Sequence, residues 1–234
     1  MSSAWRTAYR SFYYEPMNGD DLPDIVLDAA TTALLVIDLQ VAYLPDAPPP
    51  QPTPADLAEW RRWTPFRDRM HATVLPNAQR LLARFRAAQR DVLFVRIACL
   101  TKDGRDRSLS QARPGFNNLL LPHTGEESQI LPQVAPLPAE IVLTKTTDSA
   151  LTGTNLRLLL ANLGIRNVVV CGIFTDQCVA STVRSLADES FNVIVVDDAC
   201  AAATDELHRA ELTIINNIYC KVLTTDETLS ALRA

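Results

Sequence analysis

One segment specifies the topology of this chain: Val168-Val169-Val170-Cys171-Gly172-Ile173-Phe174-Thr175-Asp176-Gln177-Cys178-Val179-Ala180-Ser181-Thr182. It opens with a run of β-branched residues, which is typical of a strand buried on both faces, and Gly172 indicates a close backbone approach near the end of that strand. Thr175 and Asp176 are good helix N-caps, and the apolar residues after them, Val179, Val183 and Leu186, recur at helical spacing. The segment therefore predicts a strand, a short turn and a helix, with Cys178 in the first helical turn.

The position of Cys178 has a chemical consequence. A helix N-terminus carries partial positive charge and unpaired N–H groups, and a thiol there can have its pKa lowered from about 8.5 to roughly 3.5 to 7.5. We therefore expect Cys178 to be available as a thiolate at neutral pH. In open α/β sheets ligands bind at the carboxyl ends of the strands, which is where this turn lies. The alternative is that Cys178 is a core residue, because free cysteine is among the most buried residue types.

The rest of the chain alternates between strand-like and helix-like segments. Apolar runs predict buried strands at 33–37, 92–98, 140–144, 168–171, 192–196 and 220–224. Helical periodicity predicts helices at 55–63, 74–88, 151–163, after Asp176, at 205–218 and at the end of the chain. This alternation predicts an α/β fold: a single-domain three-layer α/β/α sandwich with a six-stranded parallel sheet, doubly wound in the Rossmann-like manner.

Two segments fall outside that pattern. Residues 1–30 form an N-terminal arm that is rich in aromatic residues, and we expect this arm to pack on the body of residues 31–234 or on another subunit; its aromatic residues are Trp5, Tyr9, Phe12, Tyr13 and Tyr14. A Pro-rich insertion at about 44–65 follows the first predicted strand, in a place where it would cover a pocket. Residues 101–138 read mostly as a long loop, which in a compact domain is often a lid.

Composition excludes several classes of function. A net charge of −5 and a pI near 5.2 argue against nucleic acid or an anionic membrane as a partner. No apolar run approaches the length of about 18 residues that a membrane span requires, and the N-terminal segment has no signal-peptide core, so we expect a cytoplasmic protein. Five cysteines without a secretory context suggest reduced thiols, of which Cys99, Cys171 and Cys200 are expected in the core.

Three ionisable residues stand at the ends of predicted parallel strands: Asp38, Lys145 and Cys178. Parallel strands present all their carboxyl ends on one side of the sheet, so these side chains can meet in a single crevice. An acid, an amine and a thiol have complementary roles there, as proton carrier, orienting positive charge and nucleophile.

At these residues the sequence resembles the isochorismatase-like cysteine hydrolases. The resemblance covers most of residues 31–225, with its motifs in order: Leu34-Leu35-Val36-Ile37-Asp38-Leu39-Gln40, then Val142-Leu143-Thr144-Lys145 with Ser149-Ala150 and Gly153-Thr154, then Gly172 to Val179, then Asp197-Asp198-Ala199-Cys200. It implies a Cys/Asp/Lys triad, in which the Cys178 thiolate attacks a carbonyl carbon, Asp38 carries the proton and Lys145 holds the charges in place.

The resemblance also implies further features. Family members commonly have a cis peptide bond ahead of the nucleophile helix, here between Ile173 and Phe174, and an oxyanion hole formed by the N–H groups of Phe174 and Cys178. Isochorismatases that cleave an enol ether lack the cysteine, so its presence favours hydrolysis of the C–N bond of a small linear amide, such as a carbamoyl or ureido compound. A homo-oligomer, a dimer or a tetramer, is expected as well.

Nicotinamidases of this family hold a metal through an Asp and closely spaced His residues after the second strand. Here that region has no His before His123, and His71 and His208 lie on predicted helices, where we expect surface residues. We therefore predict no metal and no cofactor. Substrate-binding candidates, chosen by their position in loops or beside the nucleophile, are Tyr43, Trp60, Arg105, Arg107, Phe116, Phe174 and Gln177.

Other functional classes remain as alternatives. A catalytically silent relative that binds a metabolite or a partner protein is the main one, because fold does not guarantee chemistry. A thiol redox protein is disfavoured by the lack of a Cys-x-x-Cys motif, and a dinucleotide-binding protein by the lack of Gly-x-Gly-x-x-Gly after the first strand.

Overall fold

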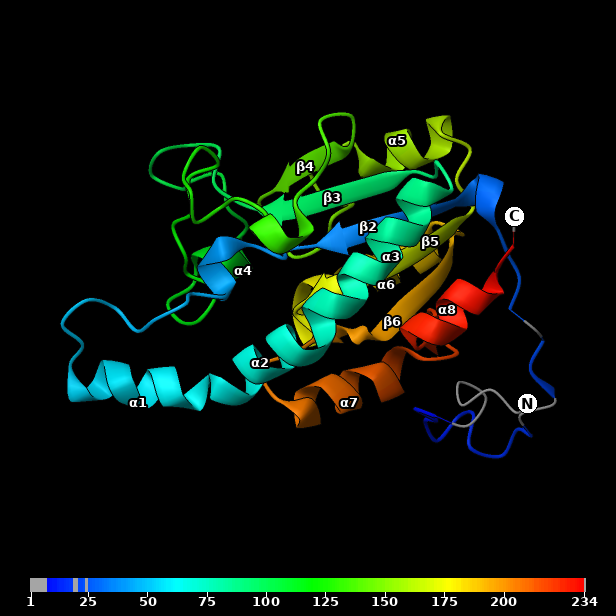
Figure 1. Cartoon of the computed structure of the whole chain (residues 1–234), viewed down its shortest axis with the longest axis horizontal. Helices are drawn as coiled ribbons and strands as arrows, with labels where there is room; N and C mark the ends of the chain where they lie inside the picture. The colour runs from blue at the N-terminus through cyan, green and yellow to red at the C-terminus, as the bar shows by residue number, and fades with distance from the viewer. Residues whose placement is uncertain (1–7, 19–20, 24, 234) are drawn as a thin grey trace.

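A six-stranded parallel sheet forms the centre of the protein, in a computed structural model that describes residues 8–18, 21–23 and 25–233 (Figure 1). Its strands are β2 (Thr32–Ile37), β3 (Val92–Ile97), β4 (Ile141–Lys145), β5 (Asn167–Ile173), β6 (Asn192–Ala201) and β7 (Lys221–Leu223). They lie in the order β4-β3-β2-β5-β6-β7, and every neighbouring pair is parallel. The predicted doubly wound α/β fold is confirmed.

Helices cover both faces of this sheet. On one face, α3 (Leu75–Ala87) and α8 (Thr225–Ala231) pack together, and α3 continues from α2 (Thr64–Arg69) through a π-helical turn at Met70–Val74. The other face carries α5 (Leu156–Asn162), α6 (Ala180–Asp188) and α7 (Asp205–Ile215), which are linked by the ion pairs Arg157–Glu189 and Arg184–Glu211. The remaining elements are α1 (Pro54–Arg62), α4 (Leu109–Ala112), the short parallel pair β1 (Leu27–Asp28) and β8 (Leu232–Arg233), and 3-10 helices at Ala29–Thr31, Val41–Tyr43 and Pro132–Val134.

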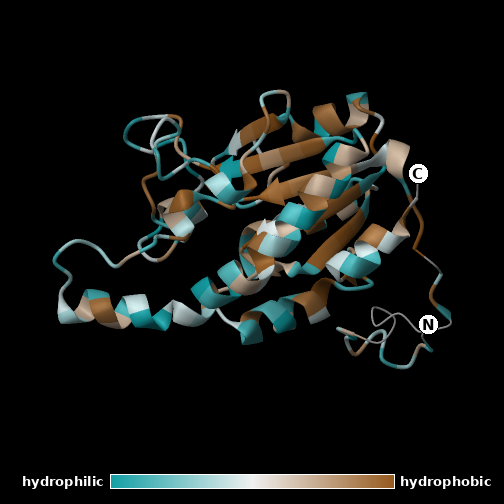
Figure 2. Cartoon of the chain, in the orientation of Figure 1, coloured by the Kyte–Doolittle hydropathy of each residue, from teal (hydrophilic) through white to brown (hydrophobic). Residues whose placement is uncertain are grey.

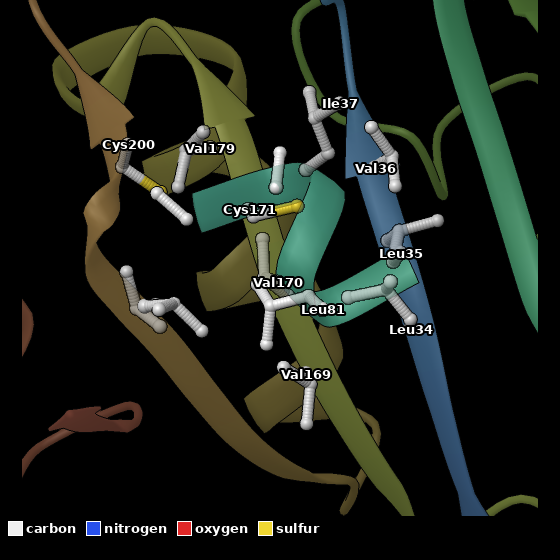
Figure 3. Close-up of a cluster of buried hydrophobic side chains, with 14 of the residues drawn as sticks. Leu34, Leu35, Val36, Ile37, Leu81, Val169, Val170, Cys171, Val179 and Cys200 are labelled. Atoms are coloured by element: carbon white, nitrogen blue, oxygen red, sulfur yellow. The ribbon is translucent and has the colours of Figure 1, made fainter. Parts of the chain in front are cut away.

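The core lies between these layers. All residues of β2 and β5 are buried, as expected for central strands that are covered on both faces. Figure 2 shows the strands as mostly hydrophobic ribbons, whereas the helices alternate between polar and apolar residues. Figure 3 shows how the layers meet, with Leu81 of α3 among side chains of β2 and β5. Cys99, Cys171 and Cys200 are buried and carry free thiols, as expected.

Several boundaries differ from the predicted ones. The helix expected at 151–163 begins only at Leu156. Before it, Gly153 adopts φ +75°, and the Thr154 hydroxyl donates to the carbonyl of Ala150 and accepts a hydrogen bond from the N–H of Leu156. Strand β6 continues to Ala201, five residues beyond the predicted end, because Asp197 and Asp198 find partners inside the protein. Phe174, and not Thr175 or Asp176, takes the N-cap position before the helical segment Thr175–Val179.

The order of the strands creates a switch point at the centre of the sheet. The chain proceeds outward from β2 through β3 to β4, and then crosses back to β5 on the other side of β2. Ligands in such sheets bind outside the carboxyl ends of the strands at this point. In Figure 1 the arrowheads of β2, β3 and β4 point toward the side on which the Pro-rich segment and the loop with α4 gather.

The described part of the N-terminal arm packs on the body. The Tyr9 hydroxyl donates to Asp197 at 2.7 Å, and Asn216 donates to the backbone carbonyls of Ala8 and Tyr9. Phe12 and Tyr13 remain largely exposed, whereas Trp5 lies outside the described residues. Across the described ranges, none of the helices is both long and apolar enough to cross a membrane.

Candidate active site

Asp38, Lys145 and Cys178 meet in a buried cluster, although they are far apart in the sequence. The Lys145 ammonium lies 2.7 Å from Asp38 Oδ2 and donates to Cys178 Sγ at 3.2 Å and to the carbonyl of Thr147 at 3.2 Å. The side chains of Asp38 and Lys145 are almost entirely buried, and Cys178 is 6% exposed. The sequence therefore identified three side chains that do come together.

Sheet register explains how they meet. Ile37 at the end of β2 pairs with Gly172 of β5, and Lys145 at the end of β4 pairs with Ile97 of β3. Two neighbouring strand spacings amount to roughly 9 to 10 Å, which the extended lysine side chain and the aspartate side chain span together across β3. Cys178 is the fourth residue of the helical segment Thr175–Val179 that follows β5 directly.

Two backbone features shape the exit of β2. A Cβ atom on Gly172, which has φ +126°, would lie 1.9 Å from the carbonyl oxygen of Ile37, so only glycine lets β5 run this close to β2. Asp38 adopts a left-handed conformation with φ +51°, which Asp tolerates better than most residues. The buried Gln40 side chain then bonds both backbone groups of Ile97 and the carbonyl of Ser128, which fixes the end of β2 against β3.

Burial and charge set the protonation of the cluster. Burial raises the pKa of Asp38, although the Lys145 ammonium opposes this rise. Burial alone would lower the pKa of Lys145, but the charges of Asp38 and Cys178 outweigh it and raise that pKa to about 12. Lys145 is therefore positively charged at neutral pH, beside a carboxyl group and a thiol whose pKa values are both raised.

The expectation of a free thiolate at neutral pH is wrong. Burial raises the pKa of Cys178 well above its ordinary value; the Lys145 ammonium opposes the rise, and the carboxylates of Asp38 and Asp148 add to it. Proximity to a helix N-terminus does not outweigh this desolvation. The resting form is thus a thiol that has a carboxylate and an ammonium within reach.

Sequence reasoning missed Asp148, a second carboxylate beside the sulfur. Its Oδ1 atom lies 3.8 Å from Cys178 Sγ and also accepts a hydrogen bond from the buried amide of Gln111. Asp148 lies between Lys145 and Ser149-Ala150, two pieces that carry the resemblance, so its place near the site could have been inferred.

His208 was also misjudged, because it is buried and not a surface residue. Its Nδ1 atom bonds the Thr175 hydroxyl at 2.8 Å, and its Nε2 atom lies 2.8 Å from Asp197 Oδ1. Arg69 lies against the same group, 2.9 Å from the imidazole and 3.5 Å from the carboxylate. This cluster holds the first residue of the helical segment that carries Cys178.

The remaining histidines are dispersed. His71 is exposed, as expected, and His123 packs against the carbonyl of Cys99. Within the described ranges, no group of three or more His, Cys, Asp and Glu side chains is arranged to hold a metal ion.

An aromatic pocket adjoins the cluster. Four of the predicted substrate-binding residues line it, namely Tyr43, Trp60, Phe116 and Phe174; the sequence missed Trp63, Phe66 and Arg67, which line it as well. The peptide bond that precedes Phe174 is cis. The Pro-rich insertion contributes Pro45, Pro49 and three residues of α1, namely Asp56, Glu59 and Trp60, so it covers the pocket as expected.

Three other predicted substrate-binding residues do not line this pocket. Arg105 is exposed and lies nearest to Asp103, at 3.9 Å. Arg107 instead donates to the carbonyls of Gly104 and Gln111 and so holds its own loop together. Gln177 is half-buried beside Cys178, outside the aromatic lining.

Comparison with known proteins identifies the family. The family model of the isochorismatase domain matches residues 32–227. The uncharacterized isochorismatase family protein YecD of Escherichia coli O157:H7 is 31% identical over 206 residues, which are 88% of this chain and 98% of that protein. The ureidoacrylate amidohydrolase RutB of Pseudomonas savastanoi pv. phaseolicola (strain 1448A / Race 6) is 27% identical over 216 residues, covering 84% of this chain and 81% of RutB. A solved structure of an isochorismatase family protein from Burkholderia thailandensis superposes with a TM-score of 0.71 at 26% identity, covering 90% of this chain and all of that one. This chain belongs to the isochorismatase family.

Proposed function

We propose that the protein hydrolyses the C–N bond of a small linear amide, such as a carbamoyl or ureido compound, through a thioester on Cys178. The observation that carries this proposal is the contact of one ammonium with both a carboxylate and a thiol, at 2.7 Å and 3.2 Å. A nucleophile, a proton acceptor and a fixed positive charge are what acyl transfer through a covalent intermediate requires.

In the first half-reaction the sulfur of Cys178 attacks the carbonyl carbon, and the thiol proton passes to Asp38. The ordinary pKa values of a thiol and an Asp carboxyl differ by about 4.6 units, which makes this transfer uphill by roughly 6 kcal/mol in water. Burial raises the pKa of Asp38 and so makes it a stronger base. The Lys145 ammonium stabilises the sulfur as it becomes negative.

The tetrahedral intermediate then collapses. Its C–N bond breaks, Asp38 returns the proton to the leaving nitrogen, and an amine or ammonia departs. Water next attacks the thioester carbon and gives a proton to Asp38. The C–S bond breaks, the acid is released, and the proton returns to Cys178, so the cycle closes without a cofactor.

The negative oxygen of each intermediate needs hydrogen-bond donors. We assign this role to the backbone N–H groups of Phe174 and Cys178, since the first N–H groups of a helix have no intrahelical partner. The carbonyl oxygen of Phe174 accepts hydrogen bonds from the backbone N–H groups of Gln177 and Val179, the two residues on either side of Cys178. Loss of one such donor typically reduces the rate by about 10² to 10³.

Amide chemistry has support from a relative as well as from the geometry. The name of the RutB relative is that of an amidohydrolase, and it is similar over 84% of this chain. A nucleophilic sulfur also suits a carbonyl substrate, because the thioester divides one difficult hydrolysis into two easier steps.

A screen for ammonia release tests the proposal. Small amides, ureas and N-carbamoyl compounds are incubated with the wild-type protein and with Cys178→Ala, and with Cys220→Ala as the matched control. Cys178 and Cys220 are similarly buried, at 6% and 7% exposure, but the hydrogen bond from Lys145 goes to Cys178. We expect Cys178→Ala to lose all turnover while folded, and Cys220→Ala to keep it; full activity of Cys178→Ala would exclude the mechanism.

Site-resolved alkylation separates this proposal from a catalytically silent relative. Iodoacetamide at pH 6 to 7 should modify Cys178 faster than Cys171 or Cys200, because Lys145 stabilises the sulfur of Cys178 as it is deprotonated. Cys171 and Cys200 are fully buried, at 0% exposure, whereas Cys178 is 6% exposed. Equal, slow labelling of all five cysteines would favour a silent binding protein.

A further inference from the structure

The pocket beside the triad is lined mainly by aromatic rings. It has a volume of about 330 Å³ and is formed between the Pro-rich segment with α1 and α2, and the loop that carries Phe116. Its rings are those of Tyr43, Trp60, Trp63, Phe66, Phe116 and Phe174. The volume lies within the range of small-molecule sites, about 300 to 1,000 Å³.

Phe174 joins this pocket to the catalytic cluster. Its ring contacts four of the other rings, with centroid separations of 5.1 to 6.0 Å. Its backbone precedes the helical segment that carries Cys178, where we place the oxyanion hole. Burial raises the pKa of Tyr43, another ring of the pocket, and the charges of Asp38 and Cys178 add to that rise. Through Phe174 the rings of the pocket adjoin the segment that carries Cys178.

The charged residues of the pocket already have partners within the chain. Asp56 accepts hydrogen bonds from the backbone and hydroxyl of Thr53, the N-cap of α1, with which it forms a capping box. Glu59 accepts from the indole of Trp63 at 2.8 Å. Arg67 donates to the carbonyl of Trp60 at 2.7 Å and lies over its ring at 3.5 Å. The aromatic rings therefore form the part of the pocket wall that a ligand would contact.

We propose that the substrate carries an aromatic or similarly flat, uncharged group, which binds among these rings while its amide carbonyl lies at Cys178. This inference rests on the proposed amide hydrolysis and defines its substrate class. A cavity of about 150 Å³ is sufficient for benzene, so a pocket of about 330 Å³ takes a phenyl ring with its linker. Aromatic rings bind one another edge-to-face or offset-stacked, as Trp63 and Phe116 already do.

The kinetic test compares matched uncharged amides, acetamide with phenylacetamide and methylurea with benzylurea. A single methylene in a hydrophobic pocket changes kcat/KM by about 10-fold to 200-fold, so we expect the wild-type enzyme to prefer the aromatic member of each pair by at least about 100-fold. Trp63→Ala should reduce this preference at least about tenfold, mainly by raising KM for the aromatic member of each pair. If Trp63→Ala folds poorly, Phe116→Ala tests the same loss of preference, because the Phe116 side chain is partly exposed.

The matched control is Phe12→Ala, an aromatic residue of the arm that is 82% exposed. It should leave every rate unchanged. A wild-type enzyme that hydrolyses acetamide as well as phenylacetamide would overturn the inference and leave amide hydrolysis intact. A Trp63→Ala variant with an altered oligomeric state and an unchanged preference would overturn it too, because the rings would then serve contact between subunits.

A binding measurement separates the two proposals. Phenylacetamide and acetamide are titrated into Cys178→Ala, and quenching of tryptophan fluorescence reports occupancy beside Trp60 and Trp63. Saturable binding of phenylacetamide, lost in Cys178→Ala/Trp63→Ala, supports the pocket assignment even where the wild-type protein hydrolyses neither compound, an outcome that refutes only the proposed hydrolysis. Absence of binding together with absence of a kinetic preference refutes the pocket assignment.

Discussion

Replacing Lys145 by Met should destabilise the protein in a pH-dependent way. The ammonium of Lys145 is fully buried and lies 2.7 Å from the buried carboxylate of Asp38. Methionine has a similar length and no charge, so Lys145→Met leaves Asp38 without its compensating charge. Removal of one partner from a buried ion pair typically costs about 3 to 5 kcal/mol. For a chain of 150 to 250 residues this corresponds to a fall in Tm of roughly 6 to 20 °C.

The direction of the pH dependence follows from the pKa of Asp38. Burial already raises this pKa in the folded protein, and loss of the opposing ammonium raises it further. A carboxyl group whose pKa is higher in the folded state binds more protons there, so its contribution to stability is lost as pH rises above the unfolded value of about 3.9. The cost of Lys145→Met should therefore grow between pH 5 and pH 8, by at most about 1.4 kcal/mol per pH unit.

Urea unfolding followed by tryptophan fluorescence at pH 5, 6, 7 and 8 measures this effect. The matched variant is Asp38→Asn/Lys145→Met, in which neither side chain carries a charge. Replacement of a whole buried pair by uncharged residues is often nearly neutral, so the double variant should regain most of the lost stability and lose the pH slope. The reasoning is refuted if Lys145→Met is as stable as wild type at every pH, or if the double variant is no more stable than the single one.

Three further substitutions test other parts of the site. Gly172→Ala should cost at least about 2 kcal/mol by urea unfolding, because its Cβ would overlap the backbone of β2, whereas Gly164→Ala, with positive φ in open space, should cost only about 1 to 2 kcal/mol. Equal costs would contradict the close approach. His208→Leu removes the partner of the buried Thr175 hydroxyl and one partner of the Asp197 carboxylate and should lower stability by about 1 to 3 kcal/mol, whereas the exposed His71→Leu should change it by less than about 0.5 kcal/mol. Asp148→Asn removes a charge that raises the pKa of the nucleophilic thiol, so the pH midpoint of its alkylation should shift downward, and an unchanged midpoint would argue against their proximity.

The triad could be predicted from the sequence because it depends on strand ends. Asp38 and Lys145 each follow the end of a short apolar run, and Cys178 lies a few residues after another. Parallel strands bring such ends to one edge of the sheet whatever the lengths of the connections between them. The fold was predictable for the same reason, since the alternation of apolar strands and amphipathic helices survives errors of a few residues at the boundaries.

The state of the thiol could not be predicted from its local motif. Position at a helix start argues for a low pKa, but the size of the opposing effect depends on how deeply the surrounding layers bury Cys178. The error at His208 was avoidable. His208, Leu212 and Ile215 have i, i+4, i+7 spacing and are all buried, so the periodicity of α7 places the histidine on its inner face.

Loop residues were the least predictable part of the site. Arg105 was chosen for its position in a loop beside the expected crevice, yet it projects into solvent, whereas Phe116 of the same loop stacks on Trp63 with a centroid separation of 5.3 Å. Loops without periodicity carry no signal for which side chain turns inward. The aromatic residues were the better candidates because burial of a large ring is favourable in almost any loop conformation.

The most direct test of the central claim is to trap the acylated nucleophile. The wild-type protein is mixed with an activated acyl donor such as p-nitrophenyl acetate, quenched in acid within its first turnovers, and digested for peptide mass analysis. We predict an acetyl group on Cys178 alone, forming at a greatly reduced rate in Asp38→Asn. Acetylation of other cysteines in place of Cys178, or equal rates in the two proteins, would contradict a nucleophile that is activated by Asp38 and Lys145.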